Sequence, residues 1–186
     1  MMRTSPLTAW FSDAQRVQGM LDFEAALARA QVECGLVPQA ALNPIIESCR
    51  HENIDFAALG QAAASAGNLA IPLVKQLTAR VKQRDDAAAR YVHWGATSQD
   101  AIDTGFILQL RGALEETDSL LQQLLDALAH QAARYQDTVM PGRTWMQHAL
   151  PVTFGLKLAG TLDALLRWQQ RLRCLLYTSP SPRDCS

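Results

Sequence analysis

The chain has 186 residues, enough for one sizeable domain, and 48% of them are hydrophobic. Its 17 Lys and Arg residues nearly balance its 18 Asp and Glu residues, so no basic face points to nucleic acid or to an anionic membrane as a partner. No apolar run approaches the roughly 18 residues of a membrane-spanning helix, and the first residues lack the apolar core of a signal peptide.

Helices are predicted throughout the first ninety or so residues. The first begins after Ser12, whose hydroxyl can accept a backbone N–H, and it ends at Gly35. Its residues at helical spacing are Val17, Met20, Leu21, Glu24, Leu27 and Ala28. Three further helices, separated by proline and glycine, are predicted at residues 38–50, at residues 54–66 and from about Pro72 onward.

The strongest pattern lies between Ser98 and Arg134. Apolar residues and one threonine recur there at steps of three or four, and they are Ile102, Phe106, Leu110, Leu114, Thr117, Leu121, Leu124 and Leu128. This predicts one helix about 55 Å long at about 1.5 Å per residue. Partner helices must cover its apolar stripe. A second long helix is predicted to begin at Pro151, after a break at residues 139–142.

Because strand signals are weak and helix formers dominate, the predicted fold is all-α. We expect a small N-terminal helical domain at residues 1–97, followed by the first two long helices of a central bundle at residues 98–176. The closing segment YTSPSPRDCS holds helix-ending prolines and resembles a translated sequencing-library adaptor. Residues 177–186 are therefore expected to be a non-native tail on a truncated N-terminal portion, with a natural disordered tail as the alternative.

The cysteines are scattered, with no CxxC pair and no histidine at zinc-ligand spacing, and they are Cys34, Cys49, Cys174 and Cys185. This pattern is typical of free thiols in a reducing compartment. The sequence therefore predicts a cytoplasmic protein that holds no metal.

Side chains that carry chemistry gather at the expected start of the long helix. A helix N-terminus offers free N–H groups and about half a positive charge, which bind carboxylate or phosphate. Imidazole, hydroxyl and amide groups stand beside it, at His93, Thr97, Ser98 and Gln99. The alternative is that Thr97 and Ser98 only cap the helix, with Asp100 supplying the carboxylate of a capping box.

Two further polar segments lie at predicted helix ends. Ser65 and Asn68 belong to SAGN, and the loop GRTWMQHALP holds Arg143, Thr144, Gln147 and His148. Arginine binds carboxylates through its guanidinium, glutamine donates a hydrogen bond, and histidine exchanges protons near neutral pH. Together the three segments predict one site for an anionic substrate, assembled from separate parts of the chain.

GATSQDAIDT and GRTWMQHALPVTFG resemble the first two signature regions of the fumarase/aspartase superfamily, which includes adenylosuccinate and argininosuccinate lyases. FSDAQRVQGMLDFEAALARAQVECGLVP and SAGNLAIPLVKQL are similar to its cycloisomerase branch, and the resemblance runs from about Ser5 to Arg173. It implies a mostly helical homotetramer whose active sites each combine three signature regions from three subunits. The third, a Gly/Ser-rich loop, has no counterpart here, so this chain alone is expected to be inactive.

The resemblance also implies roles for the site residues. Substrate-binding groups are expected at Ser65, Asn68, Thr97, Gln99, Arg143, Thr144 and Gln147. Trp145 stands where superfamily lyases commonly have histidine; its indole has no usable base and is expected to form a pocket wall. His148, His93 and Ser98 are the candidate catalytic residues, and the general acid is left unassigned between the two histidines.

The implied reaction is an intramolecular addition to a tricarboxylate such as carboxymuconate. One carboxylate attacks a double-bond carbon, and a proton is delivered to the carbon beside another carboxylate. Preorganised donors would stabilise the charge that develops, and no metal or organic cofactor is required. Two alternatives stay open: a superfamily lyase acting on a succinyl substrate such as adenylosuccinate, and a non-catalytic helical scaffold in which the polar loops only cap helices.

Overall fold

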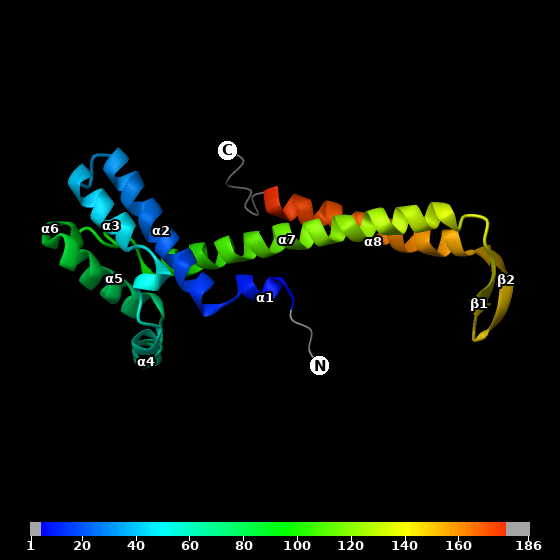
Figure 1. Cartoon of the computed structure of the whole chain (residues 1–186), viewed down its shortest axis with the longest axis horizontal. Helices are drawn as coiled ribbons and strands as arrows, with labels where there is room; N and C mark the ends of the chain where they lie inside the picture. The colour runs from blue at the N-terminus through cyan, green and yellow to red at the C-terminus, as the bar shows by residue number, and fades with distance from the viewer. Residues whose placement is uncertain (1–4, 178–186) are drawn as a thin grey trace. The chain divides into compact units, whose positions relative to one another are not determined.

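A computed structural model describes the backbone of residues 5–177 and the side chains as far as residue 174. Helices make up most of these residues, which confirms the predicted helical fold class (Figure 1). The chain divides into two compact units, Met1–Gly112 and Ala113–Ser186. The long helix α7 (Ser98–Arg134) begins in the first unit and ends in the second, with the bounds that the sequence predicts.

The first unit is built from short and medium helices whose ends follow local capping rules. The Ser12 hydroxyl accepts the Gln15 N–H at 3.3 Å, as predicted, and Gly67 ends a helix with a φ of 64°. The elements are α1 (Leu7–Trp10), α2 (Asp13–Glu33), η1 (Gln39–Ala41), α3 (Leu42–Ser48), η2 (His51–Asn53), α4 (Phe56–Ala66), α5 (Ala70–Arg84) and α6 (Asp86–Ala89).

The core of the first unit lies between α2, α3 and α5. Its largest fully buried side chains are those of Met20, Leu21, Ile45, Leu73, Leu77, Val17 and Val81. The helices α2 and α7 approach each other at two glycines, since a Cβ on Gly19 would lie 2.7 Å from the Gly105 carbonyl oxygen. This close crossing places the start of α7 against the middle of α2.

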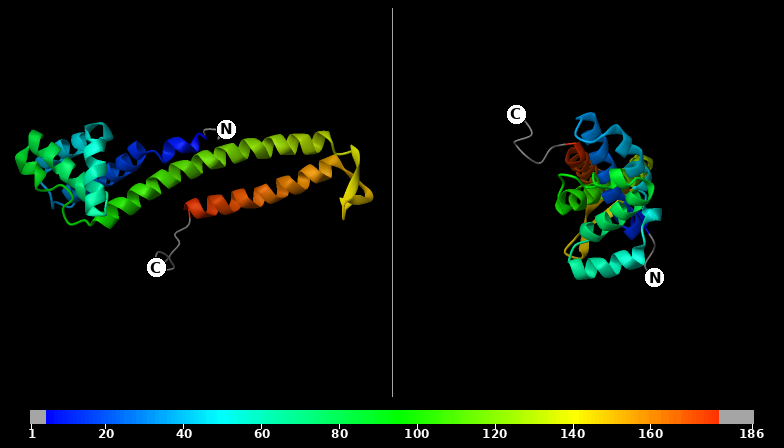
Figure 2. Two further views of the ribbon diagram at one scale, coloured as in Figure 1. Left: turned by 90° about the horizontal axis from the view of Figure 1, so that it is seen from below. Right: turned by 90° about the vertical axis from the view of Figure 1, so that its left-hand side faces the viewer.

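The second unit holds the rest of α7, a β-hairpin and α8 (Phe154–Tyr177), and Figure 2 shows the two helices running side by side. The helices run antiparallel, since Gln169 Nε2 near the end of α8 donates to Gln122 Oε1 of α7 at 2.9 Å. The predicted tail lies outside the described residues except for Tyr177, which ends α8.

The hairpin corrects two predictions from the sequence. Residues expected to form a loop make the strands β1 (Val139–Thr144) and β2 (Gln147–Thr153), and the second long helix begins at Phe154 rather than at Pro151. Pro151 instead pairs with Pro141 across the hairpin. The two prolines and the absence of alternation hide these strands in the sequence, and cross-strand pairing forms them all the same.

The face of α7 that is most deeply buried differs slightly from the predicted apolar stripe. Phe106 and Leu124 of that stripe are 51% and 48% exposed, and its other members are half-buried. The buried positions are Ala101, Gly105, Gln109, Gly112, Ala113 and Leu125. Small residues occupy this face because other helices lie close to it, as where the Trp10 ring covers Gly112.

Cys49 provides a test of the core of the first unit. Its thiol is 5% exposed, and burial, followed by the nearby charge of Glu24, raises its pKa to about 12. Because the thiolate is the reactive form, we expect Cys49 to resist alkylation at mildly alkaline pH while the exposed Cys34 reacts. Peptide mass spectrometry after iodoacetamide treatment measures both, and denatured protein, in which both should react, is the control. Equal labelling of the two thiols in folded protein would contradict this packing.

Candidate functional site

His93 lies in the segment that leads into α7, and it is paired with a carboxylate from α2. Its Nδ1 lies 2.6 Å from Glu24 Oε1, and the two side chains are 16% and 2% exposed. The His93 backbone has a φ of 57°, a left-handed conformation that few residues other than glycine adopt. Burial raises the pKa of Glu24, and the adjacent His93 acts in the opposite direction.

At the start of α7 the hydroxyl groups of Thr97 and Ser98 differ in their hydrogen bonding. Thr97 donates to Asp100 Oδ2 from its backbone N–H at 2.8 Å and from its hydroxyl at 3.1 Å. These bonds lower the pKa of Asp100. The bond from the Thr97 backbone N–H to the Asp100 carboxylate is one of the two hydrogen bonds of a capping box. Gln99 donates to Asp103 at 2.5 Å. Within residues 5–174, no side-chain hydrogen bond engages Ser98, which leaves its hydroxyl available.

Ser65 and Asn68 both make local contacts at the junction of α4 and α5. The Asn68 side-chain oxygen accepts the Ala70 N–H at 2.7 Å and the Ile71 N–H at 3.3 Å, so it caps α5. Ser65 donates weakly to the Gln61 carbonyl at 3.4 Å. Asn68 keeps its amide N–H groups for another partner, and Ser65 keeps its acceptor capacity.

The hairpin divides four predicted site residues between its two faces: the binding residues Arg143, Thr144 and Gln147, and the candidate catalytic residue His148. Arg143 pairs with His148, and Thr144 pairs with Gln147. Directly paired residues share a face and successive residues alternate, so Arg143 and His148 lie on one face and the other two lie on the opposite face. Arg143 and His148 are therefore the hairpin residues best placed to act on one ligand.

Trp145 and Met146 form the turn of the hairpin, at φ values of 46° and 63°. Positive φ at both central residues is typical of a two-residue hairpin turn, although glycine or asparagine usually occupies these positions. Trp145 is 93% exposed and Met146 is 99% exposed. Trp145, the predicted pocket wall, therefore projects from the tip of the hairpin in this chain, and its role in a pocket stays a prediction.

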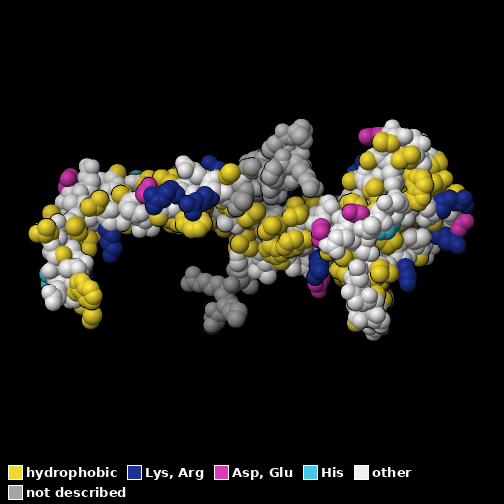
Figure 3. All heavy atoms as spheres, turned by 180° about the vertical axis from the view of Figure 1, so that it is seen from behind, with side chains coloured by type: hydrophobic (Ala, Val, Ile, Leu, Met, Phe, Trp, Pro, Cys, Tyr) yellow, Lys and Arg dark blue, Asp and Glu magenta, His cyan; other side chains and the backbone are white. Residues whose placement is uncertain are grey.

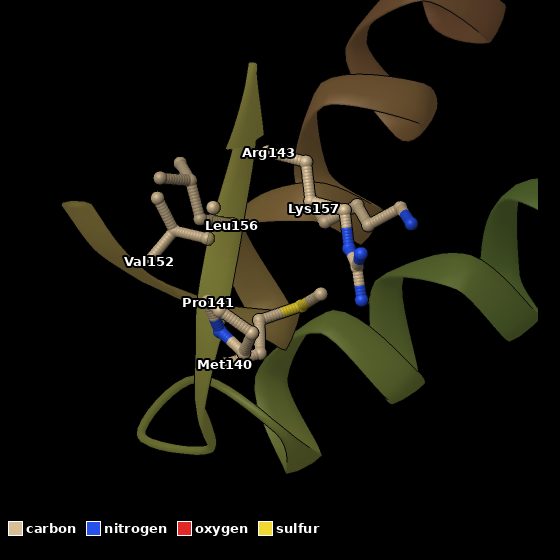
Figure 4. Close-up of a pocket in the computed structure, with 7 residues that line it drawn as sticks. Met140, Pro141, Arg143, Val152, Leu156 and Lys157 are labelled. Carbon is tan, nitrogen blue, oxygen red and sulfur yellow. The ribbon is translucent and has the colours of Figure 1, made fainter. Parts of the chain in front are cut away.

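A cavity of about 360 Å³ lies at the base of the hairpin, lined by Met140, Pro141, Gly142, Arg143, Val152, Leu156 and Lys157. Figure 4 shows the side chains of Arg143 and Lys157 ending on the same side of β1. Within residues 5–174, neither cation has a carboxylate partner. Two unpaired cations beside an apolar wall are suited to an anion that also has an apolar part.

The structure thus sorts the predicted site residues into two groups. His93, Thr97, Ser98 and Gln99 follow one another in the first unit, which also contains Ser65 and Asn68, whereas the hairpin residues belong to the second unit. In the part of the chain that the structure describes, no hydrogen bond joins the three polar segments. Whether they meet in one site stays a prediction.

Two residues that the sequence does not single out, Glu24 and Lys157, lie beside candidate site residues. Glu24 was grouped with the apolar residues of α2, although a carboxylate on the apolar face of an amphipathic helix is itself a signal of a buried partner. Lys157 lies in the first turn of α8, and only the cavity draws attention to it. Over the described ranges, no three His, Cys, Asp or Glu side chains are placed to bind a metal ion, and no helix is both long and apolar enough to span a membrane.

Comparison with known proteins gives the site a chemical context. A family model described as lyase matches residues 2–181. A 3-carboxy-cis,cis-muconate cycloisomerase of Pseudomonas aeruginosa is 58% identical over 169 residues, which are 91% of this chain and 37% of that protein. A nitrosuccinate lyase of Streptomyces davaonensis is 41% identical over 95% of this chain and 37% of its own length.

Solved structures agree with these relatives. The 3-carboxy-cis,cis-muconate lactonizing enzyme from Pseudomonas putida superimposes with a TM-score of 0.89 at 54% identity, over 91% of this chain and 39% of that one. A fumarate lyase from Mesorhizobium has a TM-score of 0.83 at 38% identity, over 90% of this chain and 38% of its own. The chain therefore spans less than two fifths of the length of these proteins, and the fold expected from the superfamily resemblance is confirmed over that span.

Proposed function

This chain belongs to the lyase family that its residues 2–181 match, and on that premise we propose that the full-length protein is a cycloisomerase of 3-carboxy-cis,cis-muconate. The observation that carries the proposal is the 58% identity over 91% of the chain to an enzyme of that name. The product would be 4-carboxymuconolactone, in the β-ketoadipate (protocatechuate) pathway, and the protein would work in the cytoplasm.

The proposed reaction forms one bond between oxygen and carbon. A substrate carboxylate oxygen attacks a double-bond carbon, and the electron pair of that double bond moves to the carbon beside another carboxylate. A proton then adds to this carbon, so the tricarboxylate gains one proton as the ring closes. The extra negative charge in the intermediate spreads onto carboxylate oxygens, which fixed N–H, hydroxyl and cationic groups stabilise.

Two parts of the chain offer such groups. The N-terminus of α7 presents backbone N–H groups and the free Ser98 hydroxyl, with His93 shortly before them in the chain. The cavity at the hairpin presents Arg143 and Lys157, with His148 on the same face of the hairpin as Arg143. His93 and His148 remain the two candidates for the proton transfer.

We further propose that the full-length protein works as a homotetramer with active sites shared between subunits. Large apolar side chains lie exposed on the helices of the second unit, and they are Leu120, Leu124, Leu156, Leu166 and Trp168. Figure 3 shows apolar side chains on the surface along these helices. Exposed apolar surface of this kind marks regions that other helices cover.

An assay of the full-length protein tests the proposed substrate. We expect it to consume 3-carboxy-cis,cis-muconate, seen as a loss of conjugated-diene absorbance, and to do so in the presence of a metal chelator. Adenylosuccinate and argininosuccinate should not react. Because lyases such as the nitrosuccinate enzyme are 41% identical, a lyase acting on a succinyl substrate is the second candidate. Turnover of a succinyl substrate, with none of carboxymuconate, would favour that candidate instead.

A further inference from the structure

The contact between Glu24 and His93 joins the core of the first unit to the segment that carries a candidate catalytic histidine. The two residues are 69 positions apart in the chain, and Glu24 Oε1 lies 2.6 Å from His93 Nδ1. When Glu24 is ionised, its carboxylate can only accept hydrogen bonds, and Nδ1 is then the donor in this pair. The other ring nitrogen, Nε2, has no partner among residues 5–174.

Stability alone does not account for a carboxylate at this position. Glu24 is 2% exposed at its side chain, and its second oxygen, Oε2, is buried with no hydrogen-bond partner in the described part of the chain. Burial raises the pKa of Glu24, which reflects the free energy of holding the charge away from water. Replacing both members of a buried ion pair by apolar side chains of similar size is often neutral or stabilising, whereas removing one partner is costly. Apolar residues in place of both Glu24 and His93 would therefore serve the core at least as well.

The segment around His93 is held on several sides. Gln31 of α2 donates to the Trp94 carbonyl at 2.6 Å, and the Tyr91 and Trp94 rings meet edge to face with centroids 6.2 Å apart. His93 itself has a positive φ of 57°, and Gly95 has a φ of 75°. A strained backbone that neighbouring contacts maintain is typical of a side chain whose direction matters.

Two further titratable groups in the described chain interact with this pair, Cys49 with Glu24 and Asp100 with His93. Besides burial, the charges of Glu24 and Asp22 raise the pKa of the buried Cys49 thiol, and the charge of Arg29 lowers it. His93 influences Asp100 at the start of α7. Among residues 5–174, Glu24 alone is in hydrogen-bond contact with the imidazole.

We propose that Glu24 is the positioning residue for His93, holding the imidazole with its proton on Nδ1 and leaving Nε2 to exchange a proton with the substrate. The proposal rests on the proposed cycloisomerase reaction. When both ring nitrogens of His93 carry a proton, the proton on Nε2 adds to the substrate carbon. The ring is then neutral, and its Nδ1–H still donates a hydrogen bond to Glu24. Water then returns a proton to Nε2 before the next turnover. An ionised carboxylate beside the ring favours this tautomer.

The test is Glu24→Leu in the full-length protein, with Asp22→Leu as the matched control on the exposed side of the same helix. We expect Glu24→Leu to stay folded but to melt at a lower temperature, because the His93 imidazole, which is 16% exposed, loses its hydrogen-bond partner. Its turnover number should fall roughly 100-fold or more, as when an acid–base histidine holds the wrong tautomer, with little change in KM. Asp22→Leu should change neither the melting temperature nor the turnover number. Glu24→Asp, which keeps the charge on a shorter side chain, should recover part of the lost turnover.

A spectroscopic readout makes the result independent of the assay. Solid-state ¹⁵N NMR of histidine-labelled protein at alkaline pH distinguishes a proton on Nδ1 from one on Nε2, and His93→Gln identifies the signal. We expect Nδ1–H in the wild type and mainly Nε2–H in Glu24→Leu. An unchanged tautomer, or full turnover after the tautomer has changed, would overturn the proposal. If the wild type does not consume carboxymuconate but the tautomer still changes, the proposed substrate fails and the positioning of His93 by Glu24 stands.

Discussion

Ser98→Ala in the full-length protein is expected to lower turnover of carboxymuconate by about 100-fold while leaving the melting temperature nearly unchanged. The reason is that the Ser98 hydroxyl has no partner in the described chain and stands at the N-terminus of α7, where a substrate carboxylate would gain charge in the transition state. Removing one preorganised donor to such a charge costs about 100-fold or more in turnover. Steady-state kinetics and a melting curve measure the two effects.

Thr97→Ala is the matched control, because the adjacent hydroxyl has a structural partner. Thr97 donates to Asp100, so its loss should lower the melting temperature and leave turnover near normal in the folded enzyme. If Ser98→Ala instead lowers the melting temperature and keeps full turnover, both hydroxyls only cap the helix. The alternative reading of this segment would then be correct.

The effect of Thr97→Ala on the melting temperature should depend on pH, because it involves the Asp100 carboxylate. Hydrogen bonds from Thr97 lower the pKa of Asp100 in the folded protein. A carboxyl group with a lowered folded pKa contributes stability above its unfolded pKa of about 3.9, and this contribution is lost as pH falls through the folded value. The difference in melting temperature between wild type and Thr97→Ala should therefore shrink in acid.

Gly105→Ala is expected to destabilise the protein strongly, and Gly19→Ala should act in the same way. A Cβ on Gly105 would lie 2.8 Å from the Met20 backbone nitrogen and 2.9 Å from Met20 Cγ. Backbone atoms cannot move aside as a side chain can, so α2 and α7 would have to separate. Overpacking of this kind typically costs about 1–3 kcal/mol, occasionally more, which outweighs the ~1 kcal/mol that alanine gains over glycine inside a helix.

Gly60→Ala provides the comparison for this substitution. Gly60 lies inside α4, and a Cβ there meets nothing within 4 Å. The same change should therefore stabilise the protein by up to about 1 kcal/mol. Thermal unfolding of the three variants measures the effect, and equal melting temperatures for Gly60→Ala and Gly105→Ala would exclude a close contact between α2 and α7.

The crossing of α2 and α7 also matters for the candidate site. Gly19 and Glu24 lie on α2, while His93 directly precedes the segment that enters α7 beside it. A change in the spacing of the two helices would move Glu24 relative to His93. We therefore expect the folded fraction of Gly105→Ala to show reduced turnover as well as reduced stability.

Local sequence signals determined most of the helices of this protein. Ser12 begins α2, Gly67 ends α4, and the apolar spacing between Ser98 and Arg134 defines α7, because capping and periodicity depend on residues only a few positions apart. The resemblance to the fumarase/aspartase superfamily was likewise readable from two short motifs. Helix signals and family motifs can both be recognised in the sequence without the tertiary structure.

Tertiary contacts decided the features that local signals do not contain. The hairpin of β1 and β2 forms through pairing of residues such as Val139 with Thr153, against sequences that show no strand pattern. Tertiary contacts also decide which face of α7 is buried, because that depends on how closely α2 approaches α7. Glu24 and His93 meet across 69 positions of the chain, so neither residue alone indicates the pair. Long-range packing, which brings distant residues to hydrogen-bond distance, is the physical reason that this part of the site is visible only in the folded chain.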